Sequence, residues 1–361
     1  MDRKRFRLDW RALTMIGALL VIWVVFTIAT DGTFLRPRNL SLLARQMSVT
    51  SILAVGMVLV IVAGQIDLSV GALSGLCGAL ATLACVRLEW PLALAFLAAL
   101  AVGAALGAMQ GSLIAWLRIP PFIVTLGGML LFQGALLGVT RGVSISPPRS
   151  FLSVGQSYLP KPAGWIAAGL VGAAMALAAL RAEDRRLRFA GYGALAAGVV
   201  AVMSAYQGVP VPVLLMLAFA AVLSTLAHQT PFGRHLYAIG GNREAAFYSG
   251  IAIERHLVGV FTLMGLLAGA AGVVLTARVG SATPNAGQLM ELDAIAAAVI
   301  GGTSLLGGQG TVWGALLGAL VMASLDNGMS LLNTESFWQL ILKGAILIAA
   351  VAVDMAGRRG R

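Results

Sequence analysis

The chain has 361 residues, of which 59% are hydrophobic and only 11% are charged. A soluble domain carries about 25% charged residues, so this composition excludes an ordinary soluble protein and indicates one embedded in lipid. The formal net charge is +11, but the basic residues lie in short runs between apolar segments rather than on one polar face. That pattern argues against nucleic-acid binding and is typical of membrane topology signals.

The chain opens with a basic stretch and then a long apolar run, residues 13–30, with no small-residue cleavage site after it. We therefore expect an uncleaved transmembrane helix rather than a signal peptide. Because a bilayer span needs about 20 mostly apolar residues, the sequence predicts twelve spans in one all-α, polytopic domain over residues 1–361. They lie near residues 12–30, 49–66, 68–86, 91–117, 122–139, 163–180, 189–206, 211–227, 255–277, 292–306, 310–331 and 337–353. Cys77 and Cys85 fall inside one span, where we expect them to be packing residues.

The distribution of basic residues predicts the orientation. With twelve spans both termini lie on one side, and that side receives 16 Lys and Arg against 8 on the other, with Lys343 inside a span. Cytoplasmic loops are the ones enriched in Lys and Arg, so both termini are predicted to be cytoplasmic.

Several predicted spans are interrupted. Residues 64–71 place polar groups and two glycines between apolar runs, Pro120 and Pro121 open the fifth span, and residues 301–310 contain five glycines. Irregular backbone at membrane depth survives only when it is buried in protein or lines a wet cavity, so these breaks point to a transport path; a turn at the membrane surface is the alternative. Glycines spaced four apart, at 103–111, 265–269 and 310–318, predict close helix packing within one subunit, a subunit interface being the alternative.

Motifs for catalysis are missing. None of the three lysines follows a glycine-rich phosphate loop, and no zinc-type spacing of His or Cys occurs. The chain is therefore not expected to be an ATPase or any other enzyme by itself, nor to bind a metal or a cofactor.

The longest polar connection, residues 228–254, lies on the predicted cytoplasmic side and contains Glu244, Ala245 and Ala246 followed by Gly250. This spacing resembles the coupling loop of ABC importer permeases, although the I-x-L-P element that often follows is missing. Three more blocks strengthen the resemblance: residues 63–71, 119–127 and 297–310 look like segments of ribose/xylose-type sugar permeases. Together the four blocks lie between residues 63 and 310.

The resemblance implies about ten core spans. This chain adds a predicted helical hairpin at about residues 163–206, which the longer xylose-type permeases also carry, so a pentose such as D-xylose is the favoured substrate. The resemblance further implies a homodimer in the bacterial inner membrane, in contact with membrane lipid. A periplasmic sugar-binding protein would lie on one side and an ABC ATPase subunit, which would hold ATP and Mg, on the other. The implied ATPase-coupling residues are Gly240, Gly241, Arg243, Glu244, Ala245, Ala246 and Gly250.

Polar residues inside spans are costly and mark candidate functional positions. The translocation-path candidates are Gln65, Asp67, Ser69, Thr125 and Asp326. Asp67 is expected either to fix the broken backbone or to line the path. Asp326 and Lys343 have similar predicted depth and are expected to form an interhelical pair, a substrate role being the alternative.

Two other functions remain open on this sequence. An ion-coupled secondary transporter would need acidic residues deep in the bundle, for which only Asp67, Asp293 and Asp326 qualify, each near a span end. A membrane-embedded enzyme would need a cluster of Asp, Glu or His facing the membrane surface, and the sequence shows no such pattern.

Overall fold

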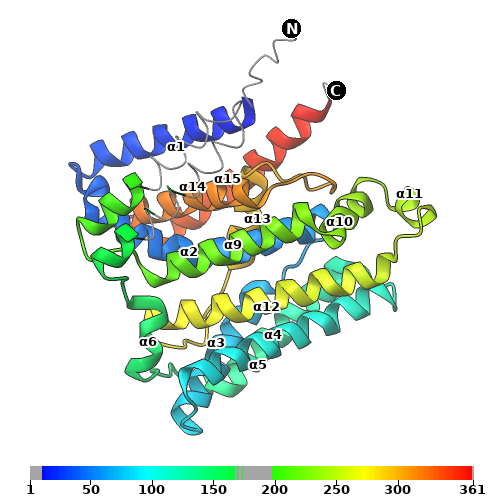
Figure 1. The fold of residues 1–361 in the computed structure, drawn as a ribbon, viewed down its shortest axis with the longest axis horizontal. Helices are drawn as coiled ribbons and strands as arrows, with labels where there is room; N and C mark the ends of the chain where they lie inside the picture. Colours follow the sequence, from blue (N-terminus) through cyan, green and yellow to red (C-terminus); the bar gives the residue numbers. More distant parts are fainter. Residues whose placement is uncertain (1–9, 167–168, 170–172, 174–196, 360–361) are drawn as a thin grey trace.

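The computed structural model describes residues 10–166, 169, 173 and 197–359, and Figure 1 shows them as a bundle of roughly parallel and antiparallel helices. The described residues contain no β-strand, only isolated bridges between Ile145 and Ala282 and between Tyr158 and Pro210. The predicted all-α class is confirmed. The helices are α1 (Trp10–Ala29), α2 (Pro37–Val62), α3 (Val70–Arg87), α4 (Leu92–Ala115), α5 (Pro121–Thr140), α6 (Arg149–Gln156), α9 (Val211–Gln229), α10 (Pro231–Gly241), α11 (Arg243–Tyr248), α12 (Ile253–Val279), α13 (Met290–Ile300), α14 (Val312–Leu331) and α15 (Ser336–Arg359), with a short 3-10 helix η1 (Thr33–Leu35).

Seven described helices are long and apolar enough to cross a membrane: α2, α3, α4, α5, α9, α12 and α14. Shorter apolar stretches in α1 and α15, Met15–Ala29 and Ser336–Ala352, add to the bundle. A polytopic membrane bundle is therefore confirmed. Most of the predicted hairpin at 163–206 lies outside the described residues.

The prediction of a span at 292–306 was wrong. Helix α13 has 11 residues, which cover only about 16 Å at 1.5 Å per residue, against a hydrocarbon core of about 30 Å. The segment just before α13 is irregular and packs against α3, where a side chain at Gly287 would overlap the carbonyl oxygen of Gly71. A glycine at position 287, which also has a φ of 82°, lets these two backbones meet. Hydropathy alone could not separate this half-length helix from a full span.

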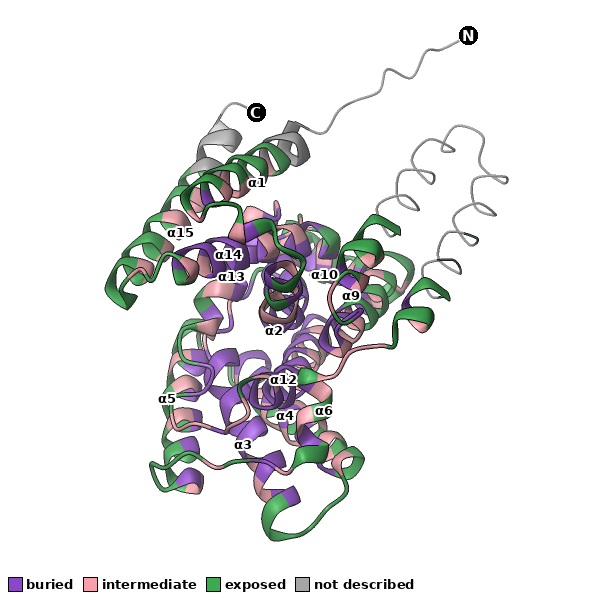
Figure 2. Ribbon diagram, turned by 90° about the vertical axis from the view of Figure 1, so that its left-hand side faces the viewer, coloured by how far each residue is buried: buried purple, intermediate pink, exposed green. Residues whose placement is uncertain are grey.

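Helix α2 forms the centre of the bundle (Figure 2), and every residue from Ser51 to Val62 is buried. It begins twelve residues before the predicted span, at Pro37, a residue whose fixed φ suits the first helical turn. In its first turn the buried Asn39 is paired: the Asn39 amide nitrogen donates to the Phe34 carbonyl and to Asn327 Oδ1, both at 2.8 Å. This pairing explains why an apolar window missed the start of the helix.

Two glycine seams hold helix pairs together, as the spacing predicted. A Cβ at Gly103 on α4 would overlap the carbonyl oxygen of Gly265 on α12, and one at Gly318 on α14 would overlap that of Ala297 on α13. Backbones at this separation gain close van der Waals contact, which is a main source of helix association in lipid.

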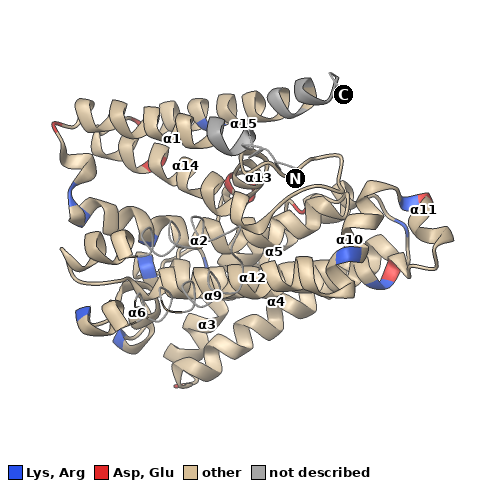
Figure 3. Cartoon of the chain, turned by 45° about the horizontal axis from the view of Figure 1, so that its top comes forward, with Lys and Arg blue, Asp and Glu red and all other residues tan. Residues whose placement is uncertain are grey.

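The charged residues lie mainly towards the two ends of the bundle (Figure 3). The glycine seam between α4 and α12 places the C-terminal part of α4 beside the N-terminal part of α12. The connection at Arg118 therefore lies at the same end of the bundle as α10 and α11. We call this end of the bundle the α11 end. The opposite end, which contains α6 and the first turns of α2, is the α6 end. Figure 1 places the start of α1 and the end of α15 towards the α11 end.

Candidate functional site

The connection predicted to couple to an ATPase folds as two short helices at the α11 end (Figure 1). The Thr230 hydroxyl accepts a 3.2 Å hydrogen bond from the Gly233 amide at the start of α10, and Asn242 Oδ1 accepts a 2.9 Å bond from the Ala245 amide at the start of α11. Side chains of this type at these positions satisfy amides that a helix leaves unpaired. The sequence therefore sets the sharp turn between α10 and α11 through Asn242.

The structure divides the predicted coupling residues between two environments. Arg243, Glu244, Ala245 and Gly250 are exposed on and after α11, and Gly241 is exposed at the end of α10. Ala246, however, is only 4% exposed and faces the permease itself. Helix α11 thus directs Ala246 back towards the bundle, and the role of Ala246 in coupling stays a prediction.

Two large side chains on the same helix were not among the predicted coupling residues. Phe247 and Tyr248 are 62% and 82% exposed, and their rings contact each other with centroids 5.7 Å apart. Exposed aromatic residues beside charged ones are typical of the energetic centre of a protein interface. Their place directly after the Glu-Ala-Ala pattern was the available signal.

Gly240 belongs to the junction between α10 and the core rather than to the exposed surface. A Cβ at Gly240 would overlap the carbonyl oxygen of Val62, the last residue of α2, and Gly307 lies against the same glycine. The Val62 carbonyl accepts a 2.9 Å hydrogen bond from the Gly308 amide. The glycine-rich break at 301–310, confirmed as irregular backbone, thus joins α10 to the end of the central helix.

Tyr237 forms a second link at this junction. Its hydroxyl donates a 2.7 Å hydrogen bond to the Gly310 carbonyl. Burial raises the pKa of Tyr237, so the phenol keeps the proton that it donates.

The predicted break between α2 and α3 contains a buried hydrogen-bonded turn. Asp67 is 2% exposed, and its Oδ1 accepts from the Ser69 amide at 2.9 Å and from the Ser69 hydroxyl at 2.7 Å. Gln110 Oε1 lies 3.0 Å from the same hydroxyl, and Thr125 Oγ1 lies 3.5 Å from the Ile66 carbonyl oxygen. Gln65 is buried, with its amide nitrogen 3.4 Å from the Ala63 carbonyl oxygen. These contacts account for the irregular backbone, and none of the four candidates in this region lines the pocket described next.

Asp326 and Lys343 lie in contact, with Lys343 Nζ 2.9 Å from Asp326 Oδ2. The same nitrogen is 3.0 Å from Asp293 Oδ2 on α13, a partner that the sequence analysis did not assign. One ammonium thus joins three helices, α13, α14 and α15.

The described residues include no group of Asp, Glu, His or Cys arranged to hold a metal ion.

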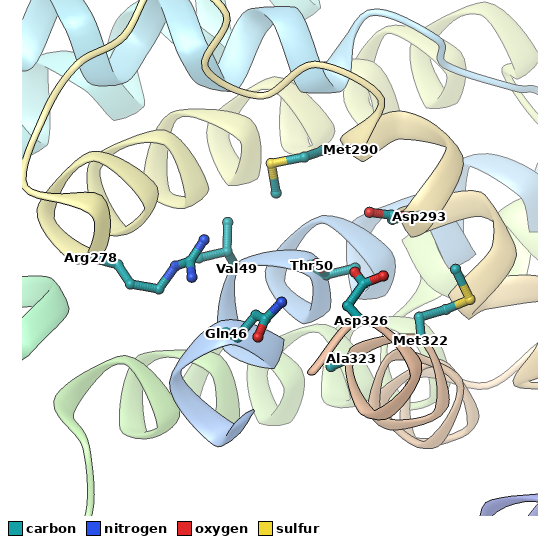
Figure 4. A pocket seen from close by; sticks show the side chains of 9 residues that line it. All are labelled: Gln46, Val49, Thr50, Arg278, Met290, Asp293, Met322, Ala323 and Asp326. Atoms are coloured by element: carbon teal, nitrogen blue, oxygen red, sulfur yellow. The ribbon is translucent and has the colours of Figure 1, made fainter. Parts of the chain in front are cut away.

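A pocket of about 100 Å³ opens beside this cluster (Figure 4). It is lined by Gln46, Val49, Thr50, Arg278, Met290, Asp293, Met322, Ala323 and Asp326. Asp326 is the only predicted path residue among them. Gln46 and Thr50 are four residues apart and therefore lie on one face of α2, which could have been predicted from the sequence. The position of Arg278 opposite them depends on how α12 packs and could not.

Comparison with known proteins places the chain in a family. The model of the family described as "Branched-chain amino acid transport system / permease component" matches residues 39–351. The chain belongs to this family.

Individual relatives match over almost the full length. The xylose transport system permease protein XylH of Escherichia coli (strain K12) is 46% identical over 98% of this chain and 93% of its own, and that of Haemophilus influenzae is 43% identical over 96% of each. The ribose import permease protein RbsC of Escherichia coli (strain K12) is 39% identical over 98% of this chain and 96% of its own. No solved structure matches the chain.

Proposed function

We propose that this chain is the membrane-spanning permease subunit of an ATP-driven ABC importer that carries a monosaccharide, a pentose such as D-xylose, across the bacterial inner membrane. The observation that carries the proposal is the 46% identity to a xylose transport permease over 98% of the chain. The exposed α11, joined through α10 to the end of the central helix, supplies the structural counterpart.

The proposed assembly has two copies of this chain surrounded by lipid. An ABC ATPase subunit docks on α11 at the α11 end, which together with both termini is assigned to the cytoplasm. A periplasmic sugar-binding protein docks at the α6 end. ATP and Mg belong to the ATPase, so this chain binds neither and is not an enzyme by itself.

Movement of the ATPase would reach the core through a short route. Displacement of α11 acts on α10, and α10 contacts both the C-terminal end of α2 and the segment at 301–310. Because α2 is buried along most of its length, its displacement would change helix packing through the whole bundle.

The buried Asp293–Lys343–Asp326 cluster favours a second candidate, an ion-coupled secondary transporter, because intramembrane carboxylates commonly relay ions. Purification in mild detergent distinguishes the two candidate functions. Co-purification of a P-loop ATPase, with sugar uptake that requires ATP, supports the importer; uptake by the chain alone, driven by a proton or sodium gradient, would support the second candidate.

A further inference from the structure

The pocket beside Lys343 contains hydrogen-bonding groups that the protein leaves unused. Arg278 Nε and Asp326 Oδ1 are buried without a hydrogen-bond partner. Across the described part of the chain, no side-chain bond or ion pair holds the Arg278 guanidinium, and none holds the Gln46 amide. More than nine in ten buried polar groups in proteins are paired, so unpaired atoms on two charged side chains that line the same pocket point to a missing partner.

The two sides of the pocket differ in chemistry. Figure 4 shows Arg278 and Gln46 towards one end and the carboxylates of Asp293 and Asp326 towards the other, with Thr50 between them. The first side supplies mainly donors and the second supplies acceptors. A ligand that contacts both sides must accept hydrogen bonds from one and donate hydrogen bonds to the other. A row of hydroxyl groups can do both.

The charge balance at the pocket selects a neutral ligand. The two carboxylates, Asp293 and Asp326, are matched by two cations, Lys343 at 3.0 and 2.9 Å and Arg278 across the pocket. Outside the pocket, Arg45 near Arg278 and Glu291 near Asp293 add one charge of each sign and keep the balance. An added cation or anion would disturb this balance inside the bundle, where unpaired charge is costly. A neutral polyhydroxylated solute would not.

We propose that this pocket is a sugar-contact site within the permease, in which Arg278, Gln46, Thr50 and Asp326 hydrogen-bond the hydroxyl groups of the sugar on its way through the bundle. The proposal rests on the proposed function and adds residues to it. Arg278 is the last but one residue of α12, so the site lies towards the α6 end, where sugar delivered opposite the ATPase would arrive. The pocket is small and would hold one edge of the sugar ring in this state.

A labelling experiment tests occupancy directly. Ala323 lines the pocket, so Ala323→Cys is made in a Cys77→Ala/Cys85→Ala background and the complete complex is reconstituted in lipid vesicles. We expect a small water-soluble thiosulfonate to modify the new cysteine and D-xylose to slow the modification. Labelling at a rate that D-xylose leaves unchanged, or no labelling at all, overturns the proposal.

A matched pair of substitutions tests the contribution to transport. Thr50→Val removes a hydroxyl from the pocket at constant shape, whereas Thr262→Val removes one that bonds the Val258 carbonyl on α12. Loss of one hydrogen bond predicts sugar uptake reduced roughly two- to tenfold in Thr50→Val at low sugar concentration, with ATP hydrolysis still stimulated by the binding protein. Equal uptake by the two variants contradicts the sugar site, whereas a wild-type complex that shows no ATP-dependent uptake contradicts the proposed function itself.

Discussion

The hydroxyl of Tyr237 donates a 2.7 Å hydrogen bond to the carbonyl oxygen of Gly310, and so ties α10 to the glycine-rich segment that leads into α14. The two residues are 73 positions apart in the chain. Together with the close approach of Gly240 to Val62, the bond makes α10 a rigid connection between the exposed α11 and the core.

Tyr237→Phe should weaken this connection without unfolding the protein. Loss of the bond costs about 1 kcal/mol, since the Gly310 carbonyl loses its partner. We expect normal amounts of inserted protein and ATP hydrolysis that persists while less sugar is moved per ATP. Tyr206→Phe, near the start of α9 at the α6 end, is the control; an unchanged ratio of sugar to ATP in Tyr237→Phe would show that the bond plays no part in coupling.

The exposed face of α11 should be separable from its buried face. Phe247→Ala with Tyr248→Ala removes two exposed rings, and aromatic residues at the centre of an interface contribute about 2 kcal/mol or more each. We expect a folded permease that no longer retains the ATPase on size-exclusion chromatography. Ala246→Arg should instead reduce the amount of folded protein, since it forces a charge into a buried position. If the double variant keeps its ATPase, α11 is not the docking surface.

The ion cluster predicts an asymmetric set of effects. Lys343→Met leaves Asp293 and Asp326 together without their cation, and removal of one partner from a buried pair costs about 3–5 kcal/mol. Asp326→Asn leaves the Asp293–Lys343 pair and should cost less. The triple variant Asp293→Asn/Asp326→Asn/Lys343→Met removes all three charges and should recover part of the stability. Thermal melting of the detergent-solubilised protein gives the order, and equal melting temperatures for Lys343→Met and Asp326→Asn would contradict it.

Asp67 distinguishes a structural carboxylate from one that titrates during transport. Asp67→Asn keeps the oxygen that accepts from the amide and hydroxyl of Ser69, so folding and sugar uptake should be nearly normal. Asp67→Leu removes the acceptor and leaves a buried amide unpaired, at a cost of about 1–3 kcal/mol. Abolished uptake in a well-folded Asp67→Asn variant would mean that the charge itself is needed, in favour of ion coupling.

Much of the fold could be predicted from the sequence because each long apolar run is itself the feature that forms a span. The breaks at residues 64–71 and 301–310 and the glycine seams were also predictable, since Gly, Pro and buried polar residues act locally. The start of α2 was missed because the polar Asn39 is paired only after Asn327 arrives from α14.

The candidate site was less predictable because it depends on contacts between distant segments. Asp326 and Lys343 could be matched by depth, but the addition of Asp293 depends on the short α13 entering from an irregular segment. Arg278 reaches the pocket only through the packing of α12 against α2. Ala246 and Phe247 are adjacent in the sequence and face opposite environments, which depends on the direction in which a single helical turn is set.

Uptake of radiolabelled D-xylose by reconstituted vesicles tests the central claim most directly. The vesicles contain this chain, its ATPase and its sugar-binding protein, and uptake is compared with ATP, with a non-hydrolysable ATP analogue, and with an imposed proton or sodium gradient alone. ATP-driven import through this permease predicts accumulation with ATP only, and no accumulation when the ATPase is left out. Accumulation driven by an ion gradient without ATP would contradict it.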